Sequence, residues 1–161
     1  MKFVIRQAEV ADAAAIAVCL REAFEPYRSQ YTAGAFADTV PDEAGIQDRL
    51  RTMTCFVAFN PTGEIVGTVA AHAQMSDIGH LRGMAVRKKW QGSGVAAELL
   101  AAAEEFLRDR GCNLITLDTT RPLARAIRFY ERYGFVATGR VQDFFGMPLF
   151  EYTKRVDTTT P

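Results

Sequence analysis

Two glycines flank a serine just before a segment with helical periodicity. These residues are Gly92, Ser93 and Gly94. Larger side chains there would block an approaching ligand, and the exposed backbone N–H groups of a helix start can receive phosphate oxygens. The basic run Arg87-Lys88-Lys89 lies on the same connection and adds positive charge. Together these residues predict a cradle for a diphosphate group.

Two classes of ligand use such a cradle, and a purely structural role is a third alternative. Gly92, Gly94 and Ala97 fit the GxGxxG/A fingerprint of dinucleotide-binding folds, with Asp118 at the end of a later strand candidate. Two observations count against a dinucleotide. The fingerprint should follow its strand directly, whereas residues 87–91 separate the preceding strand from the first glycine. The chain that remains is also short for a dinucleotide-binding fold. The structural alternative is a glycine-rich connection that lets helix and strand pack closely.

Composition indicates a globular chain with no general attraction for polyanions. Of 161 residues, 48% are hydrophobic and 24% charged, and 19 basic residues balance 19 acidic ones. Such a balance disfavours nucleic acid or an anionic membrane as a partner. The first residues lack the apolar run of a secretory signal or membrane anchor.

The cysteines indicate a reducing compartment. Cys19, Cys55 and Cys112 are odd in number, far apart and without the CxxC spacing of a metal or redox site. We therefore expect a cytoplasmic protein without a bound metal, in which each cysteine is a small core residue; a nucleophilic Cys55 is the alternative.

Hydrophobic periodicity and turn signals give the elements that must position the cradle. In the first half they predict a strand over 2–8, a helix over 11–24, a loop or broken helix over 27–41 and a second helix over 42–51. A hairpin of two strands, 54–59 and 64–74, follows. In the second half they predict a strand over 80–86, the long helix after the glycines over 94–110 and a strand over 113–118. A helix over 122–133 and two strands, 135–139 and 146–156, complete the chain's predicted elements. We expect one domain over residues 1–156 and a flexible tail over 157–161.

Two motifs resemble those of one family. QGSGVA, residues 91–96, resembles the Q/R-x-x-G-x-G/A acyl-CoA motif of the GNAT acetyltransferases, and it follows an apolar strand, HLRGMAV, as in that family. Farther along, residues 126–130 followed by Tyr133-Gly134-Phe135 resemble the family's A-x-x-x-Y-x-x-x-G-F signature. The first 75 residues agree in pattern only. Leu123 stands where the family often has Asn, which removes a polar contact to the pantetheine arm.

This resemblance implies an α/β (α+β) fold with a mixed, mostly antiparallel central sheet. Six to seven strands would be flanked by about four helices, and strands four and five would splay apart. Acetyl-CoA would bind with its diphosphate on the N–H groups of residues 91–96 and its pantetheine arm between HLRGMAV and LITLD. The expected contact residues are Met84, Ala85, Val86, Arg87, Gln91, Gly92, Ser93, Gly94, Val95, Ala96, Arg128 and Tyr130.

The same resemblance assigns catalytic roles. Tyr130 would protonate the departing thiolate, the alternative being that it only packs with Leu123 and Ile127. The N–H of Met84 would stabilise the oxyanion formed on attack. An alkylamine acceptor of pKa about 10.4 must lose a proton before it attacks. His80 is the candidate base because imidazole titrates near neutrality, although a lone strand histidine is often structural.

Aromatic side chains near the first helix and before the last strand are candidates for the acceptor pocket: Phe24, Tyr27, Tyr31, Phe144 and Phe145. They could enclose an apolar part of an amine, or they could be core residues. The resemblance implies an enzyme that moves an acetyl group from acetyl-CoA to a primary amine in a ternary complex. A small-molecule amine is the expected acceptor and a peptide the alternative, and a homodimer is compatible with the family. A non-catalytic acyl-CoA-binding regulatory module is the alternative function, and a dinucleotide binder is the third.

Overall fold

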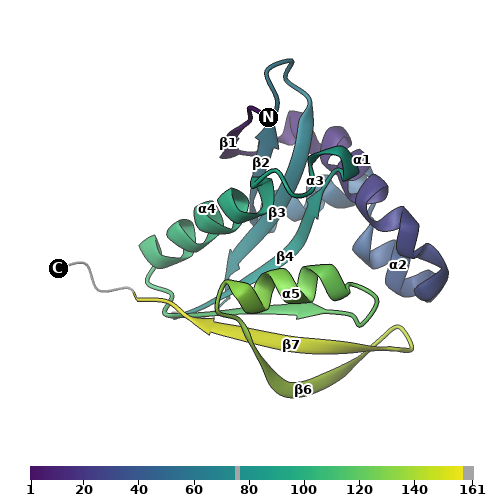
Figure 1. Ribbon diagram of the computed structural model, residues 1–161, viewed down its shortest axis with the longest axis vertical. Coiled ribbons are helices and arrows are strands. Elements are labelled where there is room, and N and C mark those ends of the chain that lie inside the picture. The colour runs from purple at the N-terminus through teal and green to yellow at the C-terminus, as the bar shows by residue number, and fades with distance from the viewer. Residues whose placement is uncertain (75–76, 158–161) are drawn as a thin grey trace.

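One mixed sheet runs through the computed structural model, which describes residues 1–74 and 77–157 (Figure 1). Within these residues the sheet has seven strands in the order β1-β2-β3-β4-β5-β7-β6. The strands are β1 (Val4–Gln7), β2 (Thr54–Phe59), β3 (Ile65–Ala73), β4 (Ile78–Val86), β5 (Leu114–Thr119), β6 (Val136–Phe144) and β7 (Met147–Arg155). Every neighbouring pair is antiparallel except β4 and β5, which are parallel.

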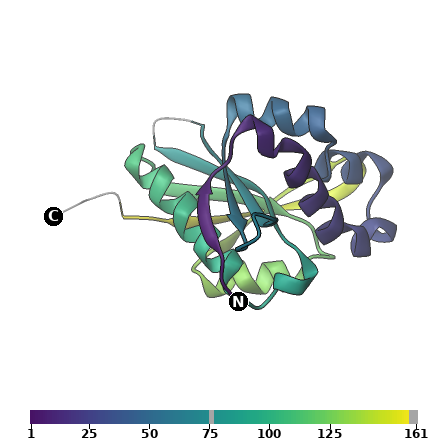
Figure 2. The ribbon, with the colours of Figure 1, turned by 90° about the horizontal axis from the view of Figure 1, so that it is seen from above.

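Helices cover both faces of this sheet (Figure 2). They are α1 (Ala13–Phe24), α2 (Ala33–Thr39), α3 (Glu43–Thr52), α4 (Val95–Asp109) and α5 (Ala124–Arg132). Ile16, Leu20 and Ile46 of α1 and α3 form one buried cluster with Val57 of β2. The side chains of α4 and α5 pack with the other face of the sheet in a second, larger cluster. Alternate residues of β2 and β3 therefore serve two cores, as the period of two in a strand requires.

The parallel pair β4 and β5 separates partway along its length. Their register runs only from Ile78 opposite Leu114 to Leu81 opposite Leu117. Beyond Leu81 the strand β4 continues to Val86 without a partner on that side. The gap faces the beginning of α4, so the splay opens a space beside the glycine turn.

A bulge in β4 lies in the unpaired part. Thr68 of β3 pairs with Ala85 and Ala70 pairs with Arg82, so Gly83 and Met84 both lie opposite Val69 and neither has a partner on β3. Gly83 has φ +64°, a left-handed conformation that suits glycine at a bulge. The bulge takes the Met84 peptide out of the regular ladder at the place where β5 has diverged.

Local sequence signals explain most element boundaries. In the β2–β3 turn, the Asn60 side-chain oxygen accepts from the N–H groups of Thr62 and Glu64, at 3.1 and 2.9 Å. Such Asx bonding favours a turn. Val95, Leu99 and Ala103 form the buried stripe of α4 at helical spacing, and Gly111 with φ +86° follows the end of the helix.

The structure confirms the predicted mixed, mostly antiparallel sheet with splayed fourth and fifth strands. The doubly wound parallel sheet of a dinucleotide-binding fold is wrong, because β4 and β5 are the one parallel pair in the described residues. The segment 27–41, predicted as a loop or broken helix, is a broken helix, with a 3-10 helix over Glu25–Gln30 followed by α2. Other details differ from the predictions. Pro122 precedes α5 instead of lying in its first turn, and β6 continues past residue 139 to Phe144. The predicted tail falls almost entirely on residues 158–161, outside the described residues.

Candidate functional site

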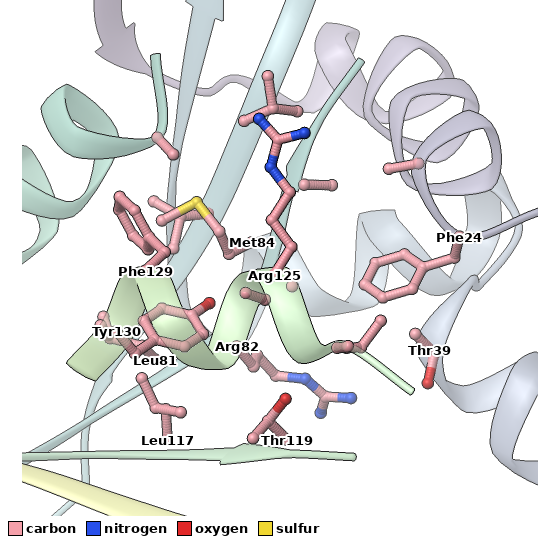
Figure 3. Close-up of a pocket in the computed structure, with 18 of the residues that line it drawn as sticks. Phe24, Thr39, Leu81, Arg82, Met84, Leu117, Thr119, Arg125, Phe129 and Tyr130 are labelled. Carbon is pink, nitrogen blue, oxygen red and sulfur yellow. The ribbon is translucent and has the colours of Figure 1, made fainter. Parts of the chain in front are cut away.

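A cavity of about 680 Å³ lies beside the splayed strands. Its walls come from β4, β5, α1, α2 and α5 and from the turn that precedes α4 (Figure 3). Gly92, Gly94 and Ala96 line the end near α4, while Phe24 and Thr39 line another part of the wall. The cavity thus joins the glycine turn to the aromatic segment after the first helix.

The glycine turn presents unused backbone donors. No hydrogen-bond acceptor is found, within the described part of the chain, for the N–H groups of Gly92, Gly94, Val95 and Ala96. The N–H groups of Gln91 and Ser93 are instead taken by the carbonyls of Lys88 and Trp90, at 3.2 and 3.3 Å. Of the expected run 91–96, these two amides are therefore already used by the turn.

The two glycines keep the turn open. Gly92 and Gly94 have φ values of +81° and +94°, which L-residues with a side chain adopt only under strain. A Cβ on Gly94 would meet no protein atom within 4 Å, so its direction is open to a ligand. Free N–H groups, the N-terminus of a 15-residue helix and this open approach fit a phosphate-bearing ligand.

Arg87 does not lie at the cradle, contrary to the expectation from sequence. Its guanidinium contacts the carboxylates of Glu22 at 2.9 Å and Glu64 at 3.2 Å. The backbone N–H of Arg87 donates to the carbonyl of Val66. These carboxylates raise the Arg87 pKa, the hydrogen bond to Glu22 having the largest effect. The Arg87 side chain therefore ties α1 to the hairpin β2–β3 and is not free for a diphosphate.

Arg125, and not Arg87, lies beside the glycine turn. Its Nη2 lies 3.8 Å from where a Cβ on Gly92 would be, and its Nη1 donates to Oε1 of Gln91 at 3.4 Å. Gln91 is held in turn by the carbonyl of Val86, to which its Nε2 donates at 3.1 Å. Arg128, also expected at the ligand, is exposed and does not line the cavity. Helical spacing was the available signal, since Arg125 lies one turn before the cavity residue Phe129.

Tyr130 lines the cavity from α5 and is almost fully buried at 9% exposure. Its ring contacts Phe129 and Phe135, and its hydroxyl has no hydrogen-bond partner among residues 1–74 and 77–157. Figure 3 shows that hydroxyl directed toward the space between the lining side chains. Burial raises the Tyr130 pKa, so the phenol stays protonated at neutral pH. It is a proton donor without a partner.

Thr119 is a second unpaired donor on the same wall. It is 4% exposed, it lines the cavity from β5, and its Oγ1 is buried without a hydrogen-bond partner in the described residues. An unpaired buried hydroxyl carries a cost of roughly 1–3 kcal/mol. A bound ligand with amide or carbonyl groups would remove that cost. The orphaned hydroxyl supports binding of a polar, extended group between the splayed strands.

His80 lies where β4 and β5 begin to part, and it lines the cavity. Its Nδ1 is 2.7 Å from Oγ1 of Thr116, and its Nε2 is 3.7 Å from Oδ2 of Asp118. Burial lowers the pKa of His80, while the charge of Asp118 opposes this effect. The same burial raises the pKa of Asp118. A neutral imidazole beside a carboxylate can accept a proton and then be stabilised as a cation. His72, the other histidine, is opposite His80 on β3 and is absent from the cavity wall.

Four of the five predicted acceptor aromatics line the cavity: Phe24, Tyr27, Tyr31 and Phe144. The Tyr31 hydroxyl is bonded to Oγ1 of Thr120 at 2.6 Å. Phe145 is not part of this wall. It is 57% exposed at the tip of the β6–β7 hairpin, and its ring lies against Gly34 of α2, where a Cβ would approach to 2.7 Å. Phe145 therefore fixes the hairpin on α2.

Three charged residues that lie on different elements and were not predicted as a group line another part of the cavity. Arg49 of α3 and Arg82 of β4 lie there with Asp38 of α2. Arg82 contacts Asp38 at 3.2 Å, whereas the Arg49 guanidinium has no ion pair or hydrogen bond within the described residues. Arg49 follows the buried Ile46 by three residues, which places it on the flank of the inward face of α3.

The remaining candidates carry no chemistry of their own. Cys55 is buried, and burial raises its pKa to about 11, which argues against the alternative of a nucleophilic Cys55. Leu123 lines the cavity as an apolar residue at the start of α5 and offers no side-chain hydrogen bond. In the described residues, no group of three or more potential side-chain ligands could hold a metal. No described helix is long and apolar enough to cross a membrane.

The chain is similar to known acetyltransferases. The sequence pattern of the Acetyltransferase (GNAT) family matches residues 16–135. Aminoglycoside N(6')-acetyltransferase type 1 of Stenotrophomonas maltophilia is 35% identical over 102 residues, which cover 58% of this chain and 66% of that protein. N-alpha-acetyltransferase MAK3 of Arabidopsis thaliana is 31% identical over 102 residues, which cover 60% of this chain and 53% of that protein. The matches thus span between about half and two thirds of these relatives.

A solved structure gives the same fold. The PaiA N-acetyltransferase of Thermoplasma acidophilum, crystallised in complex with coenzyme A, superimposes with a TM-score of 0.79. The superposition covers 97% of this chain and 100% of that chain, at 17% sequence identity. At 17% identity this similarity is evidence for the fold alone.

Proposed function

Because this chain belongs to the GNAT family of acetyltransferases, we propose that it transfers an acetyl group from acetyl-CoA to a primary amine. The single observation that carries the proposal is the cavity that joins two features. At one end are the free N–H groups of the α4 turn, and beside it is the unpaired hydroxyl of Tyr130. The first feature suits a diphosphate and the second suits a departing thiolate.

The donor would be held by the backbone of the α4 turn. Gly92, Gly94, Val95 and Ala96 offer N–H groups to the diphosphate, and Arg125 adds a cation beside Gly92. The polar arm of acetyl-CoA would run between β4 and β5, beside the Thr119 hydroxyl. When bound, acetyl-CoA supplies a thioester carbonyl that an amine can attack.

Three groups of the chain would act on the reacting atoms. The Met84 N–H, which lies in the bulge of β4, would donate to the thioester oxygen as charge develops there. The Tyr130 hydroxyl would donate its proton to the leaving sulfur. The raised Tyr130 pKa keeps that proton in place until the thiolate forms.

His80 is the proposed acceptor of the amine proton, directly or through water. Its lowered pKa keeps the imidazole neutral at pH 7, as a base must be, and Asp118 stabilises the imidazolium once it forms. An acceptor of pKa about 10.4 would otherwise cost about 4 to 5 kcal/mol to deprotonate at neutral pH.

The acceptor is proposed to be a small-molecule amine that enters beside Phe24, Tyr27, Tyr31 and Phe144. The relatives include an aminoglycoside N(6')-acetyltransferase and an N-alpha-acetyltransferase, so their names do not point to one class of acceptor. The contact of Phe145 in the β6–β7 hairpin with Gly34 of α2 supports a small acceptor, because a long peptide would need that side to be open. The three described cysteines are free thiols, which supports a reducing compartment such as the cytoplasm.

Incubation with acetyl-CoA and a panel of small amines and peptides tests the proposal. The readouts are free thiol release and the mass of the acetylated product. The expected result is transfer to at least one class of small amine. Tight acetyl-CoA binding with no thiol release across the panel would contradict catalysis and favour the alternative, a non-catalytic acyl-CoA-binding module.

A further inference from the structure

The Arg49 guanidinium is a cation at the cavity wall with no ion pair or hydrogen bond among residues 1–74 and 77–157. It lies over the backbone of Gly83, with Nη1 2.6 Å from the position that a Cβ there would take. Only glycine at 83 permits this close approach. Within the described residues no carboxylate, carbonyl or hydroxyl bonds to the guanidinium, although such partners normally accompany a partly buried arginine.

The two acidic residues near Arg49 each have another partner. Asp38 contacts Arg82 at 3.2 Å, and its charge also acts on Arg49. Asp48 lines a second cavity together with Arg49 and contacts Arg51. The group formed by Arg49, Arg82 and Asp38 therefore has two guanidinium groups and one carboxylate. Burial lowers the Arg49 pKa to about 10, which still leaves it charged at neutral pH. The wall carries an excess of positive charge.

The part of the cavity wall formed by Arg49, Arg82 and Asp38 is separate from the diphosphate cradle. Arg49 and Arg82 come from α3 and β4 and also line an adjoining second cavity of about 380 Å³, together with Asp38 and Asp48. Gly92, Gly94 and Arg125 do not line that second cavity. Figure 3 shows Arg82 extending toward Thr39, while Arg125 extends from α5 in a different direction. The free cation therefore belongs to the region left for the acceptor.

We propose that Arg49, supported by Arg82, binds an oxyanion group on the acceptor, so that the substrate is an amine that also carries a carboxylate, phosphate or phosphonate. This inference rests on the proposed function, because it assigns the substrate class of the same cavity. Guanidinium groups bind such planar or tetrahedral oxyanions through paired N–H donors. A polycationic amine would be repelled by the same wall.

Matched acceptors that differ only in the anionic group test the substrate class. One pair is β-alanine and β-alanine amide, and the other is 2-aminoethylphosphonate and ethanolamine. We expect kcat/KM for the better anionic member to exceed that of its neutral partner by about 10- to 100-fold, the usual effect of a hydrogen-bonded charge. The two pairs distinguish a carboxylate from a phosphonate. Equal rates within both pairs would overturn the inference and leave the proposed function intact.

The variant Arg49→Gln tests the residue. It should remove the preference for the anionic acceptor through a rise in the KM of that acceptor, with the acetyl-CoA Kd at the wild-type value. Arg49→Lys should recover part of the preference because it keeps the charge. Arg51→Gln on the exposed side of the same helix is the matched control and should behave as wild type. A preference that survives in Arg49→Gln, or a loss of acetyl-CoA affinity in it, would overturn the assignment.

A binding measurement separates failure of this inference from failure of the proposed function. Methylphosphonate and propionate, which carry no amine, are titrated into wild type and Arg49→Gln and followed by NMR. Saturable binding to wild type that is lost in Arg49→Gln supports the anion site even if no acetyl transfer is detected. Equal response of the two proteins to both probes would contradict it.

Discussion

Nε2 of His80 lies 3.7 Å from Oδ2 of Asp118, and the two side chains come from β4 and β5 where the strands begin to separate. Thr116 bonds to the other ring nitrogen at 2.7 Å. The imidazole is thus held between two residues of β5 and faces the cavity, an arrangement that suits a base whose cationic form is stabilised after it accepts a proton.

The first prediction concerns pH. Burial and the charges of Arg82 and His72 lower the pKa of His80 below 6.5, while Asp118 and Glu151 oppose them. The base is therefore active above this lowered pKa, and kcat/KM should fall about tenfold per pH unit below it. His80→Gln should lose this acidic limb and roughly 100-fold or more of its rate at neutral pH. His72→Gln, on the neighbouring strand, should keep the limb; an unaltered limb in His80→Gln would exclude His80 as the base.

The second prediction concerns the leaving group. Tyr130→Phe removes one unpaired hydroxyl and leaves the ring that packs on Phe129 and Phe135. We expect kcat to fall by about 10²- to 10⁴-fold, the usual contribution of a general acid, with the acetyl-CoA Kd unchanged. Tyr152→Phe is the control, because Tyr152 is buried to the same degree in the same core and does not line the cavity. Steady-state kinetics and calorimetry give the two readouts; wild-type kcat in Tyr130→Phe would rule out the assigned role.

The third prediction concerns the open approach at the glycine turn. Gly94→Ala places a methyl group where no protein atom lies within 4 Å, so any clash must be with the ligand. We expect the acetyl-CoA Kd to rise roughly 10- to 100-fold, as overpacking typically does. Gly63→Ala at φ +85° in the hairpin turn is the matched control. Both variants should lose about 1–2 kcal/mol of stability from backbone strain, but only Gly94→Ala should lose affinity. Equal affinity in both would mean that the ligand binds elsewhere.

The fourth prediction separates two arginines. Arg125→Gln should raise the acetyl-CoA Kd by roughly fivefold, about 1 kcal/mol, and the difference should shrink as salt is added because the site is exposed. Arg87→Gln should leave this Kd unchanged, since Glu22 and Glu64 already hold its side chain. Calorimetric titrations at two salt concentrations measure both. A larger effect from Arg87 than from Arg125 would contradict the assignment.

Most helices and strands and the positive-φ turn at Gly92 and Gly94 could be predicted from the sequence, because they depend on local signals. The mixed sheet with splayed strands was implied by the resemblance to the GNAT family. Helical and strand periodicity set most elements, and glycine at positions 92 and 94 marks a backbone conformation that few other residues adopt. The predicted role of Tyr130 depends on a motif that lies within a single helix and the turn after it. The cavity contains that residue as expected.

Residues whose roles depend on distant partners were not predictable in this way. Arg87 was expected at the cradle, but its partner Glu22 lies 65 residues earlier in the chain. Phe145 was expected in the acceptor pocket, but contact with Gly34 across two elements holds it outside. The free guanidinium of Arg49 becomes apparent only when α3 and β4 are seen together, because its neighbour Gly83 belongs to a bulge that no local pattern specifies.

The most direct test of the central claim is a crystal structure of the protein with acetyl-CoA. The account predicts diphosphate oxygens within hydrogen-bond distance of the N–H groups of Gly92, Gly94, Val95 and Ala96. It also predicts the sulfur atom beside the Tyr130 hydroxyl. Coenzyme bound away from the start of α4, or a thioester separated from Tyr130 by other side chains, would contradict the account.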